Sequence, residues 1–158
     1  MTVHRVSDPA VKAAFDAYPQ LIREPLENLR STILDVALAI PGIGPLEESL
    51  KWGQPAYRPI RPRTGTTVRI GQWGGNGPDY ALYVHCQTNL MDEFRSLYTG
   101  RFRFDGQRAV VFQAGEVPPD DALRHCIALA LTYHAREASN VKAPPKTQRA
   151  QQLVENRV

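Results

Sequence analysis

Apolar residues recur at three- and four-residue intervals through the N-terminal quarter of the chain, which is the spacing of one helical face. The strongest run predicts a long helix over 23–39. A shorter helix begins at a cap within 7–8, where a Ser-Asp-Pro opening favours a first turn, and ends before Pro19. The Pro- and Gly-rich segment 41–45 stops the long helix, and one more helical turn is expected over 46–52.

A change to β-branched and aromatic residues farther along the chain predicts two hairpins. The first joins strands over 66–73 and 80–86 through a Gly-rich turn. The second joins strands over 101–104 and 107–112 through an Asp-Gly dipeptide at 105–106, because that dipeptide accepts the positive φ angles of a type I′ turn. Alternation along 80–86 places its even-numbered residues on one face and its odd-numbered residues on the other.

The remaining segments complete an α+β order. A short amphipathic helix over 90–97 lies between the hairpins, and a Pro-led helix over 119–138 closes the fold. Helices that are segregated from hairpins in this way cover one face of an antiparallel sheet. We therefore expect one α+β domain over 1–138, with four to five antiparallel strands covered on one face by the N-terminal, middle and C-terminal helices. The polar, basic segment 139–158 is expected to be a mobile tail.

Length and composition fit a single globular domain. A chain of 158 residues with 42% hydrophobic and 22% charged residues can bury its own core, which excludes a disordered or fibrous protein. The longest apolar stretch contains Asp35, Pro41 and Gly42, so it is too broken to span a membrane, and no targeting segment is recognisable. We expect a cytoplasmic protein in which Cys86 and Cys126 are reduced thiols of the core.

Positive charge is carried mostly by arginine. The net charge is +3, and fifteen Arg stand against four Lys, which suits the recognition of carboxylates and phosphates but also fits codon usage. If residues 105–106 form a two-residue loop, Arg103 lies directly opposite Arg108, and like charges in that position destabilise a sheet. Solvent, a neighbouring carboxylate or a bound anion would relieve the repulsion.

The segment 53–63 contains three prolines and is predicted to be an exposed, extended arm instead of a central strand. It belongs to a basic region interleaved with Tyr57 and Trp73. The arginines of this region are Arg58, Arg61, Arg63 and Arg69. Such a region could follow a phosphate backbone, but no recognised nucleic-acid motif accompanies it, so nucleic acid is disfavoured as a partner.

The most distinctive run of the chain is LKWGQPAY at 50–57. Its two rings, Trp52 and Tyr57, suit the walls of a ligand cleft, with Gly53 allowing close approach of the backbone. The alternative is that both rings cap the core where helix passes to sheet. The full set of candidate ligand-binding residues is Trp52, Gly53, Pro55, Tyr57, Trp73, Tyr83, His85, Arg103 and Arg108.

The same run carries a family resemblance. The residues Trp52, Gly53, Pro55 and Tyr57 match the central motif of the YdhG-like family of uncharacterised bacterial domains, which the chain resembles over about 19–134. The resemblance implies a frataxin-like fold and, for part of the family, a role as an intracellular iron chaperone. Iron favours oxygen ligands, and the candidates on the first two helices are Asp16, Glu24 and Glu27. No other cofactor is expected.

Two His-Cys pairs, at 85–86 and 125–126, invite comparison with a zinc site. Neighbours on a strand point to opposite faces, and neighbours on a helix lie about 100° apart, so the four side chains do not converge on one ion. Neither pair has a recognisable third group that would orient a Cys-His nucleophile.

Three functions remain open from the sequence. We favour a non-enzymatic module that binds a small anionic ligand or a protein partner. An iron-binding chaperone of the frataxin type and an enzyme of unrecognised class are the alternatives. The sequence leaves the oligomeric state open.

Overall fold

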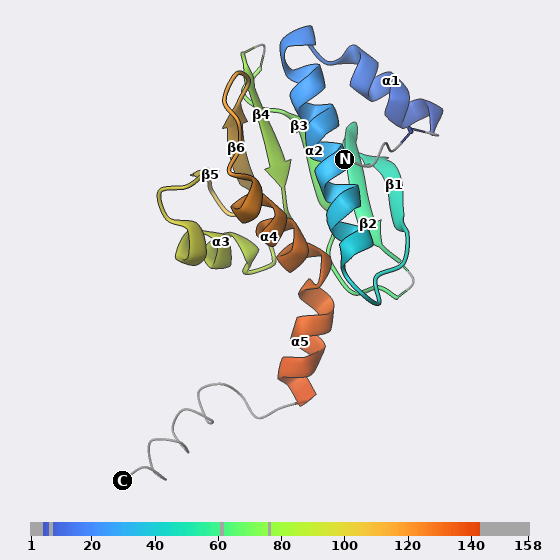
Figure 1. Cartoon of the computed structure of the whole chain (residues 1–158), viewed down its shortest axis with the longest axis vertical. Helices are drawn as coiled ribbons and strands as arrows, with labels where there is room; N and C mark the ends of the chain where they lie inside the picture. The colour runs from blue at the N-terminus through green and yellow to red at the C-terminus, as the bar shows by residue number, and fades with distance from the viewer. Residues whose placement is uncertain (1–4, 7, 61, 76, 143–158) are drawn as a thin grey trace.

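The chain folds into one antiparallel sheet that carries its helices on one side (Figure 1). The computed structural model describes residues 5–6, 8–60, 62–75 and 77–142. The helices within these residues are α1 (Pro9–Ala17), α2 (Gln20–Ala39), α3 (Leu90–Tyr98), α4 (Asp120–Leu131) and α5 (Tyr133–Lys142). The strands are β1 (Leu46–Lys51), β2 (Gln54–Pro59), β3 (Val68–Gln72), β4 (Asp79–Tyr83), β5 (Arg103–Asp105) and β6 (Ala109–Gln113). Their order in the sheet is β1-β2-β3-β4-β6-β5, which confirms the α+β class and adds one hairpin to the two predicted.

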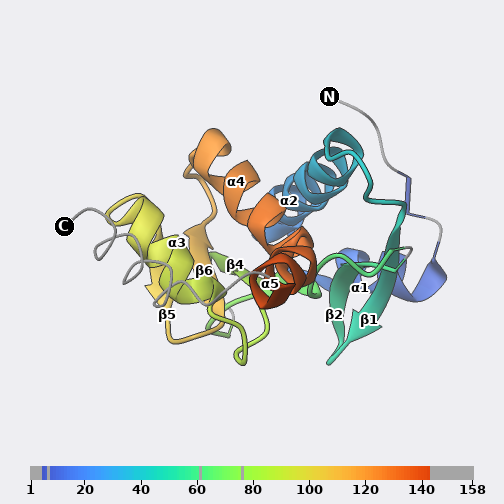
Figure 2. The same ribbon diagram turned by 90° about the horizontal axis from the view of Figure 1, so that it is seen from below.

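The main core lies between the sheet and the helices. Figure 2 shows α2 and α4 lying across one face of the strands. Alternate strand residues, among them Tyr57, Ile70, Leu82 and Phe112, point to this face and are buried against helix residues such as Ile127. Full burial of one such large apolar side chain contributes roughly 1.5–3 kcal/mol, so this layer provides most of the stability.

The other face of the sheet carries a second, smaller apolar cluster. Its buried members are Ala81, Tyr83, Ala109 and Val111, with Trp73 packed against them. Among the described residues, no helix side chain belongs to this cluster. We call this side the open face of the sheet, and the alternation predicted for 80–86 is confirmed as far as residue 84.

The hairpin β1–β2 corrects two predictions. The expected helical turn over 46–52 is strand β1, and the expected arm over 53–63 begins as strand β2, which lies second from the edge of the sheet. Lys51 pairs with Gln54, so Trp52 and Gly53 form a two-residue turn, with φ angles of 55° and 74°. Positive φ at both central positions is the requirement of a type I′ turn.

A buried ion pair explains why β1 hides its strand pattern. Leu46 and Leu50 contact the main core, and Glu48 lies between them on the same side of the strand. Arg30 Nε donates to Glu48 Oε2 at 2.5 Å, and the Tyr57 hydroxyl donates to the same oxygen at 2.6 Å. Burial raises the pKa of Tyr57, and the hydrogen bond and charge of Glu48 raise it further. A carboxylate on the core side therefore interrupts the apolar alternation that identifies a strand.

The contact between β2 and β3 is a short seam in the sheet. Only two residue pairs join these strands, Ala56 with Arg69 and Tyr57 with Val68. Beyond the ladder, the Tyr18 hydroxyl donates to the Ile70 carbonyl at 3.5 Å. Burial, with a smaller effect of a neighbouring tyrosine, raises the pKa of Tyr18 to about 12. Side chains therefore replace part of the backbone pairing along this seam.

The hairpin β5–β6 has a different register from the predicted one. Arg103 pairs with Val111, and Asp105 pairs with Ala109, so the connection is the three-residue segment 106–108. The predicted pairing of Arg103 with Arg108 is wrong, because Asp105 belongs to the strand instead of the loop. Arg103 donates instead to Asp79 of β4 at 2.7 Å, so a carboxylate relieves its charge.

The closing helix is broken in two. The predicted continuous helix over 119–138 is interrupted at Thr132, whose hydroxyl donates to the Ala128 carbonyl at 2.7 Å. The loop before β3 fills the break, because Thr66 N donates to the Ala130 carbonyl at 3.0 Å. Gly65 lies so close to the end of α4 that a Cβ atom there would overlap the Leu131 carbonyl group.

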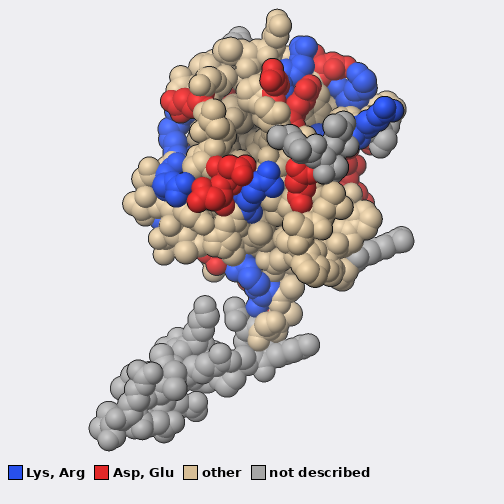
Figure 3. All heavy atoms as spheres, viewed as in Figure 1, with Lys and Arg blue, Asp and Glu red and all other residues tan. Residues whose placement is uncertain are grey.

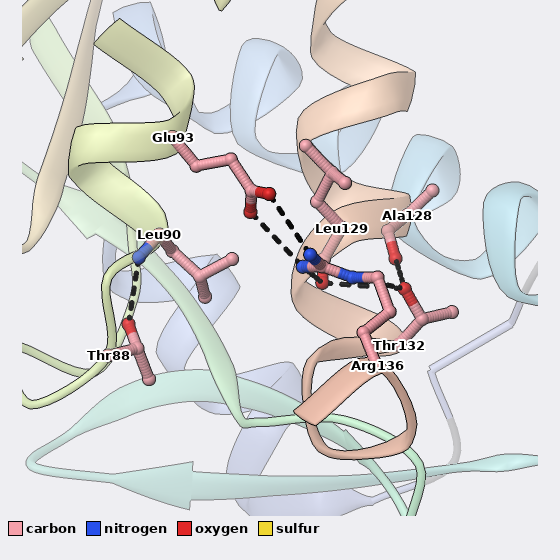
Figure 4. A network of polar contacts seen from close by, with 7 residues as sticks. All are labelled: Thr88, Leu90, Glu93, Ala128, Leu129, Thr132 and Arg136. Carbon is pink, nitrogen blue, oxygen red and sulfur yellow. Dashed lines mark hydrogen bonds and ion pairs between the residues drawn. The ribbon is translucent and has the colours of Figure 1, made fainter. Parts of the chain in front are cut away.

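Arg136 links α5 to two other helices through hydrogen bonds. Its guanidinium donates to both carboxylate oxygens of Glu93 on α3, at 3.0 and 3.2 Å, and to the Leu129 carbonyl of α4 at 2.7 Å. Figure 4 shows Arg136 and Glu93 pointing toward each other between α3 and the end of α4. Bidentate arginine–carboxylate pairs of this kind fix orientation as well as charge.

The ends of the described chain bear on three predictions. Of the two predicted caps of α1, Asp8 accepts from Ala10 N at 2.8 Å, whereas Ser7 lies outside the described residues. Residues 139–142 of the predicted tail belong to α5, and 143–158 also lie outside the described residues. Within the described part of the chain, no helix combines the length and apolar character needed to cross a membrane.

Candidate functional site

A cleft of 560 Å³ is lined by residues of the β1–β2 hairpin together with residues in or next to β3, β4 and β6. This volume lies within the range of small-molecule sites, which is about 300–1,000 Å³. The residues that line it are Lys51, Trp52, Thr67, Arg69, Val84, His85, Cys86 and Arg108. Three of these eight carry a positive charge and none is a carboxylate, so the cleft favours an anion.

The strands fix where the cationic side chains begin. Lys51 is the last residue of β1 and is held by its pairing with Gln54. Arg69 lies in β3 opposite Ala56 and Tyr83, on the open face. Arg108 precedes β6, and its carbonyl accepts from Val84 N at 2.8 Å. The three cations therefore reach one cleft from β1, from β3 and from the residue that precedes β6.

Arg69 is the most constrained of these cations. Its Nη1 donates to Gln54 Oε1 at 2.6 Å, and its guanidinium carbon lies 5.3 Å from the centre of the Tyr83 ring. Burial lowers the pKa of Arg69, Tyr83 opposes this change, and the charge of Arg108 lowers the pKa further. A guanidinium carries five N–H donors, so the bond to Gln54 leaves donors for an anion.

Trp52 forms the rim of the cleft with an exposed ring. Trp52 is 90% exposed, and among the described residues it is the one aromatic member of the large exposed apolar residues. It is also the one described residue other than glycine with a positive φ. Backbone in this region disfavours residues with a Cβ, and such outliers are frequent at ligand sites.

A second cleft, of 380 Å³, continues from the first and shares Thr67 and His85 with it. It adds Arg63 and also Arg58, whose Nε donates to Glu47 at 2.8 Å on the open face. The predicted basic region is thus divided between two adjoining clefts, while Arg61 lies outside the described residues.

The charge pattern of the cleft differs from that of the helix-covered side. Figure 3 shows Lys and Arg side chains lying beside Asp and Glu side chains on the face that carries α2 and α4. Opposite charges that lie side by side on a surface largely cancel at a distance. The lining of the cleft has no such carboxylate.

The structure brings together only some of the predicted site residues. Trp52, His85 and Arg108 line the cleft. Gly53 completes the turn beside it, whereas Pro55 and Tyr57 are buried, so Tyr57 caps the core instead of walling a cleft. The two aromatic residues of the open face also lie outside the lining, with the Trp73 ring centre 6.1 Å from that of Tyr83. Arg103 lines a separate hollow near β5 and is paired with Asp79.

Five lining residues were not among the predicted site residues: Lys51, Thr67, Arg69, Val84 and Cys86. Arg69 had been assigned to the basic region, and the other four had no assigned role in a site. Cys86 is exposed, so its predicted core position is wrong. Cys86 follows the end of β4, where the alternation that would bury it has stopped. Cys126 is buried as predicted, and burial raises the pKa of its thiol to about 12.

The described residues offer no metal cluster. They contain no group of three His, Cys, Asp or Glu side chains arranged to hold an ion. Of the carboxylates that the family resemblance suggested, Asp16 forms a surface ion pair with Lys12 at 3.0 Å, and Glu24 and Glu27 lie along α2. The two His-Cys pairs also lie in different parts of the fold. His85 and Cys86 line the cleft, whereas Cys126 is buried in the main core and His125 Nδ1 is hydrogen-bonded to the Tyr98 hydroxyl at 2.5 Å.

Comparison with models of protein families, with curated proteins and with solved structures found no match to this chain. Function is therefore inferred from the chemistry of the cleft.

Proposed function

We propose that this protein is a non-enzymatic binding module whose ligand is a small anion held in the cleft on the open face. The observation that carries the proposal is the lining itself, which combines Lys51, Arg69 and Arg108 with no carboxylate. Guanidinium groups bind phosphates and carboxylates through paired N–H donors, which suits a compact anion with two or more oxygens.

The expected affinity is modest. A hydrogen bond to a charged group contributes roughly 1.5–3 kcal/mol, so two such bonds from Arg69 and Arg108 would supply about 3–6 kcal/mol. Free energies of this size correspond to dissociation constants from several millimolar down to about 50 µM. Screening by salt weakens contacts made by exposed charges, so affinity should fall as ionic strength rises.

The test is calorimetric titration with inorganic phosphate and citrate, using Fe(II) as a separate arm. Wild-type protein should bind the anions, and Arg108→Ala should weaken binding at least about tenfold, in line with the loss of one charge-assisted bond. Arg103→Ala is the matched control, because Arg103 is an exposed arginine paired with Asp79 outside the cleft. The affinity of the Arg103→Ala protein for anions should equal that of the wild type.

Two results would overturn the proposal. One is the absence of anion binding by the wild type at low ionic strength, which would direct attention to a protein partner. The other is binding that Arg103→Ala and Arg108→Ala weaken equally, which would indicate a general charge effect. If the wild type binds Fe(II) but none of the anions, the result would favour the iron-handling role that the family resemblance implies.

A further inference from the structure

The shape of the cleft points to the class of anion, an inference that rests on the proposed function. We infer that the ligand joins a planar aromatic ring to its anionic group, with the ring on Trp52 and the anion on Arg69 and Arg108. Nucleotides and aromatic carboxylates both have this composition. The evidence comes from the backbone, exposure and position of Trp52.

The backbone at Trp52 is costly for a tryptophan. Its φ of 55° lies in the left-handed region, which Gly and Asn enter much more readily than a bulky residue. Asn-Gly is the preferred pair for the two central positions of such a turn, and Trp-Gly stands there instead. Folding alone would therefore favour another residue at position 52.

The indole gains little within the protein in return. Its side chain is 90% exposed, and among the described residues no aromatic partner contacts it. Trp73 provides the contrast, because its ring lies 6.1 Å from that of Tyr83 on the open face. An exposed ring at the rim of a cleft has one face available for stacking with a planar ligand.

The cleft is also larger than a bare anion requires. Its 560 Å³ extends from Trp52 on the β1–β2 turn to Arg108 before β6, and the exposed Trp52 ring is the large apolar group of its lining, because the Val84 side chain is buried in the main core. Inorganic phosphate would contact the cations alone and leave the indole of Trp52 without a ligand contact. A ligand with an aromatic ring beside its anion would contact both kinds of surface.

The experiment compares phosphate esters that differ only in the group attached. The ligands are glycerol phosphate, phenyl phosphate and AMP, with benzoate and adenosine as a carboxylate and an uncharged ring. Stacking should make phenyl phosphate or AMP bind roughly 5- to 100-fold more tightly than glycerol phosphate. Tighter binding of AMP than of phenyl phosphate and benzoate would assign nucleotides, whereas binding of AMP no tighter than that of these two ligands would assign simple aromatic acids.

The decisive variant is Trp52→Asn, which suits the observed φ and should fold at least as stably as the wild type. It should abolish the preference for aromatic esters while leaving the affinity for glycerol phosphate unchanged. Trp73→Phe is the matched control and should retain the preference. With Trp73 replaced, ligand stacking should also quench the fluorescence of Trp52 directly.

The outcomes separate the two proposals. Equal affinities for the three phosphate esters, or a preference that survives in Trp52→Asn, would overturn the aromatic class and leave anion binding intact. Failure of all the anions to bind the wild type would overturn anion binding itself. Tight binding of adenosine alone would show that the ring, without the anion, determines recognition, and would overturn both.

Discussion

Replacing Glu48 by Gln should strongly destabilise the fold, because it removes the negative partner of a buried arginine. Glu48 accepts from Arg30 through both carboxylate oxygens, at 2.5 and 3.1 Å, and from the Tyr57 hydroxyl at 2.6 Å. The Arg30 and Glu48 side chains are only 6% and 14% exposed. Burial disfavours the charged form of Arg30, but the hydrogen bond and charge of Glu48 outweigh it and raise the pKa of Arg30.

The magnitude follows from what the amide can replace. Removing one partner of a buried ion pair costs roughly 3–5 kcal/mol, because the remaining charge loses its counter-charge without regaining water. The amide oxygen of Gln can still accept a hydrogen bond worth about 1 kcal/mol. We therefore expect Glu48→Gln to lower the free energy of unfolding by about 3 kcal/mol, a large part of the 5–15 kcal/mol typical of a domain.

Equilibrium unfolding in urea measures this loss. For a slope of about 2 kcal/mol per molar urea, the transition midpoint should fall by roughly 1.5 M. Tyr57→Phe should cost less, about 1.5–2 kcal/mol, since it removes one hydrogen bond to a charged group. The double variant Arg30→Met with Glu48→Leu should recover much of the loss, because no charge remains buried. A loss below about 1 kcal/mol for Glu48→Gln would refute the reasoning.

Three further predictions concern packing, ionisation and the cleft. Gly65→Ala should lower the free energy of unfolding by about 3 kcal/mol through overlap with the end of α4, whereas Gly77→Ala, whose Cβ would meet no atom within 4 Å, should be nearly neutral in the same urea assay. The pKa of the Cys126 thiol rises from 9.0 to about 12 on folding, so its contribution to stability is complete below pH 9 and is lost as the pH rises toward 12. The urea midpoint should therefore fall as the pH is raised over this range, and this fall should be smaller in Cys126→Ala. In the folded protein one thiol, that of Cys86, should react with thiol reagents. Arg108→Ala should slow the reaction of Cys86 with an anionic disulfide reagent about two- to fourfold and leave its reaction with a neutral methanethiosulfonate unchanged. Equal slowing of both reagents would contradict the last prediction.

The fold class was predictable because most of its elements follow simple periodicities. The long helix has one apolar face, and the central strands are short runs of apolar residues that alternate between the two faces of the sheet, so both signals survive without tertiary information. The first hairpin was missed for two local reasons. Glu48 places a charge on the core side of β1, and Pro55 and Pro59 argue against a strand at β2. In a two-residue hairpin these prolines occupy non-hydrogen-bonded pairs with β1, so their nitrogens face the short seam with β3, where a missing N–H costs little.

Part of the lining of the candidate site was predictable from the sequence. The excess of arginine suggested an anion and the distinctive Trp52 suggested a cleft, and Trp52, His85 and Arg108 do line one cleft, which is the site of the proposed anion. The register of β5–β6 decides that Arg103 is excluded, and a one-residue change of loop length is not visible in the sequence. Lys51 enters the cleft only through the turn beside Trp52, so it could not be found before that hairpin was known.

The cleft spans the seam between β2 and β3, so a ligand in it would link the two parts of the sheet that this seam separates. Backbone pairing joins β1 and β2 over six residue pairs, and the seam joins them to the remaining sheet over two, so amide exchange through partial opening is expected to begin there. Lys51 and Trp52 belong to the two-strand side of this boundary, while Arg69 and Arg108 belong to the four-strand side. A ligand held by both sides would act as a brace across the weakest line of the sheet, so that occupancy of the cleft and cooperative unfolding of the whole domain would become one linked equilibrium.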